Sequence, residues 1–184
     1  MLMMHQLINP FLKSLALEFD KRTALESEAL RWALEEIGNG EEGKNNKGPM
    51  VEKYQSVTGH GGAWCASYIS WAYSIAAKQL EIEPVFKYSS SAKRLAKNVA
   101  KTGSTLKTPE PGAIICWHRG PTDKDWRGHV GIIKAVDGDS IITVEGNRGR
   151  YPAKVREFRY PNGLWRSRLY KIVTVRQPEP IDRE

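Results

Sequence analysis

The sequence predicts an α+β fold in which N-terminal helices pack on an antiparallel β-sheet of about five strands. Two observations favour this class. In the first hundred residues, apolar side chains recur every three or four positions, which is helical spacing. From Pro111 onward the pattern changes to short apolar runs rich in β-branched residues and separated by turn residues. Helices followed by a run of strands are typical of the α+β class.

The helices are expected at five places. Asn9-Pro10 opens the first, the capping box Thr23–Glu26 opens the second, and Gly38 ends the second. The apolar residues of the first helix are Phe11, Leu12, Leu15 and Phe19. The later helices are expected over residues 50–55, over 63–78, and between the caps Ser89–Ser91 and Gly103.

Strands and loops complete the expected fold. Residues 38–48 form a polar, glycine-rich loop that we interpret as solvated, because its acidic residues lack the ligand spacing of a calcium loop. Strands are expected over residues 113–117, 129–136, 140–145, 153–160 and 165–175. We divide the chain into an N-terminal helical extension (1–22), a main folded domain (23–176) and a tail (177–184).

The composition is that of a folded domain with a basic surface. The 184 residues are 40% hydrophobic and include six tryptophans, enough to bury a core. The net charge of +7 favours anionic partners such as nucleic acid, anionic lipid or acidic wall polymer. Two cysteines, Cys65 and Cys116, are too few for a disulfide framework and too far apart for a CxxC motif.

The start of the chain lacks the features of a signal peptide. Residues 1–10 have no cationic segment and no small-residue cleavage site. No apolar run approaches the roughly 18 residues that span a bilayer. We therefore expect synthesis in the cytoplasm without a signal peptide and no stable membrane insertion.

A cysteine at the start of a helix is the first part of a candidate active site. Cys65 lies in the predicted first turn of helix 63–78, after the flexible segment Gly59–Gly62. A helix N-terminus and a neighbouring imidazolium lower a thiol pKa from about 8.5 and produce a reactive thiolate. Unpaired amides of that turn can also stabilise an oxyanion. We predict that Cys65 is a nucleophile; the alternative is an ordinary buried cysteine.

His129, at the start of an apolar strand, is the candidate base. A two-residue turn at Asp137-Gly138 would place His129 opposite Gly146 on the next strand. A three-residue loop with a bulge would instead place it opposite Asn147, on the same face as Glu145. We predict the three-residue loop. Either Glu145 or Asn147 could then orient the imidazole.

Other residues give weaker signals. Cys116 and His118 share one face of a strand and form a rival pair, although a cysteine in an apolar strand is more typical of a core. His60 lies in a glycine loop that would hold it poorly. These cysteines and histidines match no structural zinc spacing, so no metal or cofactor is expected. Trp64 and Trp126 are candidate substrate-binding residues, next to Cys65 and on the loop before His129.

Four segments, in this order, resemble the CHAP family of cysteine, histidine-dependent amidohydrolases and peptidases. They are Gly62–Tyr68, Pro111–Ile115, Gly128–Ile132 and Val144–Asn147. The resemblance spans roughly residues 25–175 and implies a papain-like, NlpC-type core. By position, it implies Cys65 as nucleophile and His129 as base. It also implies that Glu145 and Asn147 complete the polar set.

The resemblance implies a peptidoglycan hydrolase that acts as a monomer on the bacterial cell wall or in the periplasm. The bond cut would join glycan to stem peptide, or lie within the stem or cross-bridge. A phage endolysin would be accompanied by a holin, and a secreted effector amidase by a cognate immunity protein. An acyltransferase on the same core is a further alternative. The chain has arginine-rich strands but no signature of a nucleic-acid-binding module, so no nucleic-acid partner is expected.

Overall fold

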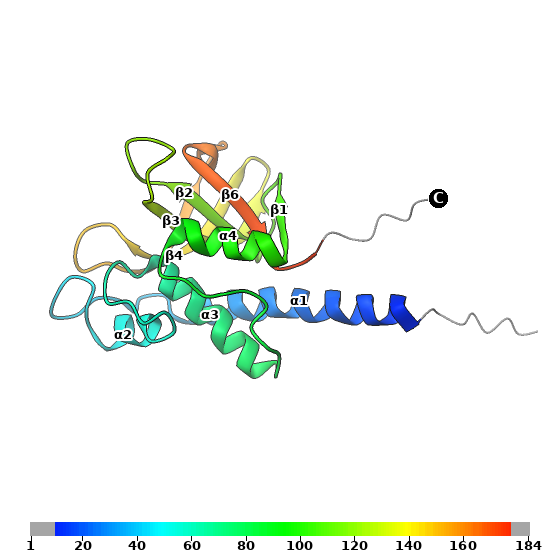
Figure 1. Cartoon of the computed structure of the whole chain (residues 1–184). Coiled ribbons are helices and arrows are strands. Elements are labelled where there is room, and N and C mark those ends of the chain that lie inside the picture. Colours follow the sequence, from blue (N-terminus) through cyan, green and yellow to red (C-terminus); the bar gives the residue numbers. More distant parts are fainter. Residues whose placement is uncertain (1–9, 178–184) are drawn as a thin grey trace, which may run out of the picture.

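The computed structural model describes residues 10–177, except for several side chains between residues 10 and 19. The apolar side chains expected on the first helix, those of Phe11, Leu12, Leu15 and Phe19, lie outside the described part, as does the tail after residue 177. Figure 1 shows helices packed along one side of a β-sheet, which confirms the predicted α+β class.

The described residues form four α-helices, a 3-10 turn and six strands. The helices are α1 (Pro10–Glu35), α2 (Pro49–Gln55), α3 (Cys65–Gln79) and α4 (Ala92–Thr102). The strands are β1 (Ser104–Leu106), β2 (Ile114–His118), β3 (Gly128–Asp137), β4 (Ser140–Arg148), β5 (Lys154–Tyr160) and β6 (Leu169–Thr174), with η1 (Leu164–Arg166) before β6. Each strand is antiparallel to its neighbours in the order β1-β6-β2-β3-β4-β5. The edge strand β1 was not predicted.

Helix α1 is continuous where two helices were predicted. The capping box at Thr23–Glu26 does not start a new helix; Ser27 Oγ donates to the Thr23 carbonyl (3.1 Å), as happens inside a helix. No glycine or proline interrupts the segment after Pro10, so nothing breaks it. The proposed boundary at residues 22 and 23 falls within this helix. Arg22 Nη1 donates hydrogen bonds to the carbonyls of Thr102 (3.0 Å) and Val175 (2.8 Å).

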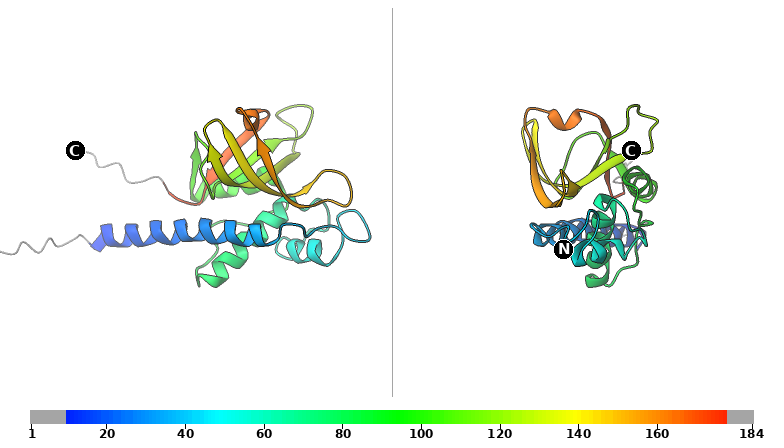
Figure 2. Two further views of the ribbon diagram at one scale, coloured as in Figure 1. Left: turned by 180° about the vertical axis from the view of Figure 1, so that it is seen from behind. Right: turned by 90° about the vertical axis from the view of Figure 1, so that its left-hand side faces the viewer.

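The sheet buries apolar side chains on both faces, as strand alternation requires. One face packs against the helices through Ile114, Cys116, Val130, Ile132, Val144 and Val173. The other face holds a second cluster formed by Ala113, Ile115, Trp117, Ile133, Ile141, Trp165 and Ile172. Figure 2 shows that the sheet is strongly curved, so the second cluster fills its concave side.

The hairpin of β3 and β4 has the predicted pairing of residues, but a different loop from the one predicted. Its loop has two residues, 138–139, rather than the predicted three. A bulge at Lys134 then shifts the register by one residue. Continued along the strands, this register places His129 opposite Asn147, as the three-residue loop would have done. The predicted loop is wrong, but the bulge within the strand has the same effect.

A buried tryptophan holds the start of α3 against β4. Trp64 precedes α3 and was expected to line a substrate cleft. It is 0% exposed and packs in the core instead, so that expectation is wrong. Its ring lies against Gly146, where an added Cβ would come within 2.5 Å of Trp64 Cζ3. The ring also stacks on Tyr54 of α2, with centroids 5.6 Å apart. Because Trp64 is fixed in this way, Cys65 is held close to the sheet.

Glu41 extends this attachment into a loop that we interpreted as solvated. It is 3% exposed and accepts hydrogen bonds from Trp64 Nε1 (3.2 Å), Asn46 N (2.9 Å) and Ala153 N (2.7 Å). Three donors offset the cost of burying the carboxylate. The interpretation of residues 38–48 as solvated is therefore wrong at Glu41, which ties the start of α3 to the turn before β5.

We predict that Gly146→Ala destabilises the fold by about 1–3 kcal/mol, because the new methyl group overlaps the buried Trp64 ring. Urea unfolding followed by tryptophan fluorescence measures the change. Gly61→Ala is the matched control, since a Cβ there meets nothing closer than the Lys47 Nζ atom at 3.8 Å. Equal stability of the two variants would contradict the close approach of α3 to β4.

Candidate active site

The first residue of α3 places a thiol inside the protein, next to an imidazole from β3. Cys65 is 5% exposed. Burial raises the pKa of the Cys65 thiol, but the interaction with His129 outweighs burial. The charge of Arg119 and the backbone amide of Ala66 act in the same direction. The pKa of Cys65 therefore lies below its usual value, which favours the thiolate.

His129 uses its two ring nitrogens in different ways. Nε2 lies 2.7 Å from Glu145 Oε2. Nδ1 is buried and has no hydrogen-bond partner of standard geometry within the described chain, which leaves it for the neighbouring thiol. Burial lowers the pKa of His129, but Cys65 and Glu145 together raise it above the usual value. The thiolate and the imidazolium therefore stabilise each other.

Glu145 is a fully buried carboxylate surrounded by donors. Besides His129, it accepts hydrogen bonds from Thr143 Oγ1 (2.6 Å), Tyr160 Oη (2.7 Å) and Arg148 Nη1 (3.1 Å). Burial raises the pKa of Glu145, but His129, Thr143 and Arg148 reverse the effect and lower it. Glu145 therefore faces the imidazole as a charged group.

Asn147, the other candidate to orient the imidazole, makes no hydrogen bond to it. The residue is half-buried and has a left-handed backbone (φ 56°) at a point where the register of β4 and β5 shifts. Its side chain makes no hydrogen bond to any residue of the described chain. The structure thus brings Cys65, His129 and Glu145 together, with Asn147 beside them on the strand.

Two partners of Glu145 were not predicted: Arg148, three residues further along the chain, and Tyr160, on the neighbouring strand β5. Arg148 and Tyr160 hydrogen-bond each other as well as Glu145, and the Arg148 guanidinium lies over the rings of Phe158 (4.3 Å) and Tyr160 (5.2 Å). Thr143 was also missed. A signal existed for Thr143, because a residue two positions before Glu145 on a strand shares its face.

A cleft of about 310 Å³ opens onto the imidazole. Its walls are formed by Trp117, His118, Arg119, His129, Arg148, Tyr160, Leu164, Ser167 and Arg168. The Trp117 ring stacks on the rings of His129 (centroids 6.1 Å apart) and Tyr160 (5.2 Å). Substrate can therefore approach His129 from the concave side of the sheet.

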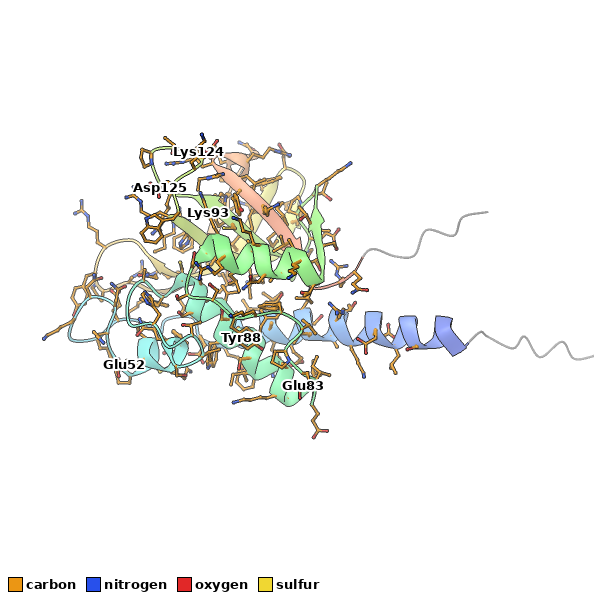
Figure 3. The ribbon with its side chains drawn as sticks, viewed as in Figure 1. Glu52, Glu83, Tyr88, Lys93, Lys124 and Asp125 are labelled. Carbon is orange, nitrogen blue, oxygen red and sulfur yellow. The ribbon has the colours of Figure 1, made fainter. Side chains whose placement is uncertain are left out.

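Trp126, the second candidate for substrate binding, lies on the loop before β3. It is 78% exposed and lines a second cleft, of about 480 Å³, between this loop and α4. Figure 3 shows Lys93 reaching from α4 toward the loop that carries Lys124 and Asp125. Lys93 Nζ donates to the carbonyls of Asp123 (3.1 Å) and Asp125 (2.5 Å), which holds the loop in place.

The rival thiol and histidines are placed differently from Cys65 and His129. Cys116 is buried in the core, where burial and the nearby Cys65 raise its pKa well above the usual value. His60 is exposed on its loop. Among the described residues, no three His, Cys, Asp or Glu side chains are grouped so that they could hold a metal ion.

The comparisons with known proteins agree with this geometry. The model of the CHAP domain family matches residues 57–147, a range that contains Cys65, His129 and Glu145. No curated protein sequence matches the chain. Within residues 10–177, no helix has the length and apolarity needed to cross a membrane.

Solved structures show the same fold. A crystal structure of Ly7917 superposes with a TM-score of 0.52 at 22% identity, over 81% of this chain and 61% of that one. The crystal structure of Ly7917 with the hydrolyzing product of MDP gives a TM-score of 0.52 at 21% identity, over 81% and 62%. This chain thus spans about three fifths of the length of the chains it superposes on. The match of the CHAP domain model thus identifies residues 57–147 as a CHAP domain.

Proposed function

We propose that the protein is a peptidoglycan hydrolase that cleaves an amide bond with Cys65 as nucleophile. The observation that carries this proposal is the buried chain of contacts from Cys65 through His129 to Glu145. The three groups are those of a thiol nucleophile, its base and the group that orients the base. The CHAP domain supports the same activity, as does the structural similarity to Ly7917, which was crystallised with the hydrolyzing product of MDP.

The proposed reaction has two steps. The Cys65 thiolate attacks the amide carbonyl carbon, so a C–S bond forms and the oxygen becomes an oxyanion. No side chain caps α3 at its N-terminus, so the backbone amides of the first turn are available to stabilise this oxyanion. The His129 imidazolium gives its proton to the leaving amine as the C–N bond breaks, which leaves a thioester.

The second step releases the acyl group. Neutral His129 takes a proton from water, and the resulting hydroxide attacks the thioester carbonyl. The C–S bond then breaks, which restores the thiolate next to the imidazolium. Throughout, the charge of Glu145 holds the ring by Nε2 and stabilises its protonated form.

The biological setting is a further part of the proposal. The bond cut is that of an amidase or an endopeptidase, and the protein acts on the cell wall or in the periplasm as an endolysin or as an effector. The holin or immunity protein that would accompany these roles belongs to the same proposal. So does the role of Trp126 in substrate binding. A pure transferase is less favoured, because the cleft at His129 is open to water.

We predict that Cys65→Ala loses lysis of purified peptidoglycan by at least about 10³-fold, because no other group can form the thioester. Cys116→Ala is the matched control and retains lysis, since that thiol lies in the core with a raised pKa. The fall in turbidity of a wall suspension and mass spectrometry of the released fragments measure activity and the bond cut. Full activity of Cys65→Ala would exclude the mechanism.

We predict that activity is lost on both sides of a pH optimum. It falls as pH decreases through the lowered pKa of Cys65, where the thiolate is protonated. It falls again as pH rises through the raised pKa of His129, where the proton for the leaving amine is lost. Glu145→Gln removes the charge that stabilises the imidazolium, so the pair of Cys65 thiolate and His129 imidazolium forms less readily.

The rate at which iodoacetamide alkylates Cys65, measured as a function of pH, follows the formation of the thiolate without a substrate. We expect the midpoint to move up by about one pH unit in Glu145→Gln, because His129 loses its opposite charge and is then less often protonated to stabilise the thiolate. Glu157→Gln, which removes an exposed carboxylate paired with Lys134, is the control and keeps the wild-type midpoint. If Glu145→Gln also keeps the wild-type midpoint, the Glu145 carboxylate does not stabilise the pair of Cys65 thiolate and His129 imidazolium.

A further inference from the structure

The cleft at His129 has an uneven distribution of charge. Three arginines line it, Arg119, Arg148 and Arg168, and no acidic side chain is among the lining residues. An anion in this cleft would therefore meet guanidinium groups in the same cleft as the His129 ring. Concave sites lined by one sign of charge attract ligands of the opposite sign.

The three arginines differ in how far their charges are already balanced. Arg148 is paired with the buried carboxylate of Glu145 (3.1 Å). Arg168 donates to the carbonyl of Gly120, an uncharged partner that leaves its charge in place. Arg119 has no ion pair and no side-chain hydrogen bond to any residue between 10 and 177. Arg119 and Arg168 thus have charges available for a ligand.

The position of Arg119 relates this free charge to the nucleophile. Its side chain is exposed, follows directly on β2, and is near enough to Cys65 to act on the thiol electrostatically. A group bound to Arg119 would therefore lie close to a carbonyl attacked by Cys65. The apolar part of the cleft, formed by Trp117, Tyr160 and the 59%-exposed Leu164, suits the aliphatic carbons that carry such a group.

We propose that this cleft selects substrates with a free carboxylate next to the scissile amide, and that Arg119, assisted by Arg168, binds this carboxylate. The inference rests on the proposed hydrolase function and adds the substrate class: a wall peptide with a carboxylate rather than a carboxamide beside the bond. Arginine is suited to this distinction because its planar guanidinium bonds both carboxylate oxygens at once. A carboxamide has nearly the same shape but no charge.

Alkylation of Cys65 tests the inference without a wall substrate. Iodoacetate and iodoacetamide differ only in carboxylate against carboxamide, and the ratio of their rates with Cys65 is compared with the ratio for free cysteine. We expect Cys65 to favour iodoacetate by about tenfold relative to free cysteine, the size of one charge-assisted contact. Any change in the thiolate fraction cancels in the ratio, because it affects both reagents equally.

Variants assign this preference to the cleft. Arg119→Gln should lower the ratio about tenfold, and Arg119→Lys should keep part of it because the charge remains. Arg159→Gln is the matched control: it removes an exposed arginine whose ion pair with Asp137 lies at the far end of β3, and it should leave the ratio unchanged. A ratio that is the same in wild type and Arg119→Gln would overturn the inference.

Cleavage of paired substrates gives the second measurement. Two muropeptides that differ only in a carboxylate or carboxamide next to the cleaved bond are compared by chromatography. We expect Arg119→Gln to raise KM for the carboxylate form about tenfold, with little change for the carboxamide form. Equal loss on both would overturn the inference while leaving the hydrolase intact. Absence of cleavage by wild type, with the alkylation preference present, would overturn the hydrolase and support the cleft.

Discussion

The close approach of α3 to β4 is the constraint on which the candidate site depends. The Trp64 ring lies on Gly146, a position where a methyl group would already overlap it. Cys65 directly follows Trp64 in the sequence, and Glu145 directly precedes Gly146. One buried contact therefore fixes the distance between the thiol on the helix and the carboxylate on the strand. Glu41 reinforces this contact by holding the indole nitrogen of Trp64.

Electrostatics explain why a site so deeply buried can stay charged. Three ionisable groups without partners would neutralise rather than remain ionised in the interior. Here Glu145 is hydrogen-bonded by four side chains, and each of the three groups faces one of opposite charge. Arg148 and Tyr160 matter because they keep the carboxylate ionised, which in turn favours a protonated His129 next to a thiolate Cys65. Arg119 has no ion pair within residues 10–177, and it is there that we propose a substrate carboxylate binds.

The parts of the site that could be predicted from sequence have local signals. Cys65 follows a glycine segment at a helix start. Strand alternation puts His129 and Glu145 on one face of the sheet, whether the extra residue lies in the loop, as predicted, or at Lys134 within the strand. The parts that could not be predicted depend on distant contacts. Arg148 meets Tyr160 only because β4 and β5 pair, and Glu41 is buried only because the turn before β5 covers it. Trp64 was assigned to the cleft for a similar reason, since nothing local shows that Gly146 lies against its ring.

The fold shows the same division. The order of helices and strands follows from periodicity, but the continuity of α1 does not, because the capping box at Thr23–Glu26 also fits inside a helix that has no breaker. Strand β1 has three residues, too few for a periodic pattern, and exists because β6 offers it a pairing edge. The bulge at Lys134 has no turn residue to mark it.

The account depends above all on the charge state of His129, which nitrogen NMR measures directly. The ring signals of His129, assigned by their loss in His129→Gln, should show both nitrogens protonated at a pH above the ordinary histidine pKa of about 6.5. In Cys65→Ala this protonation should weaken, because the thiolate is gone. A neutral ring in the wild-type protein at that pH would contradict the thiolate–imidazolium pair and the mechanism built on it.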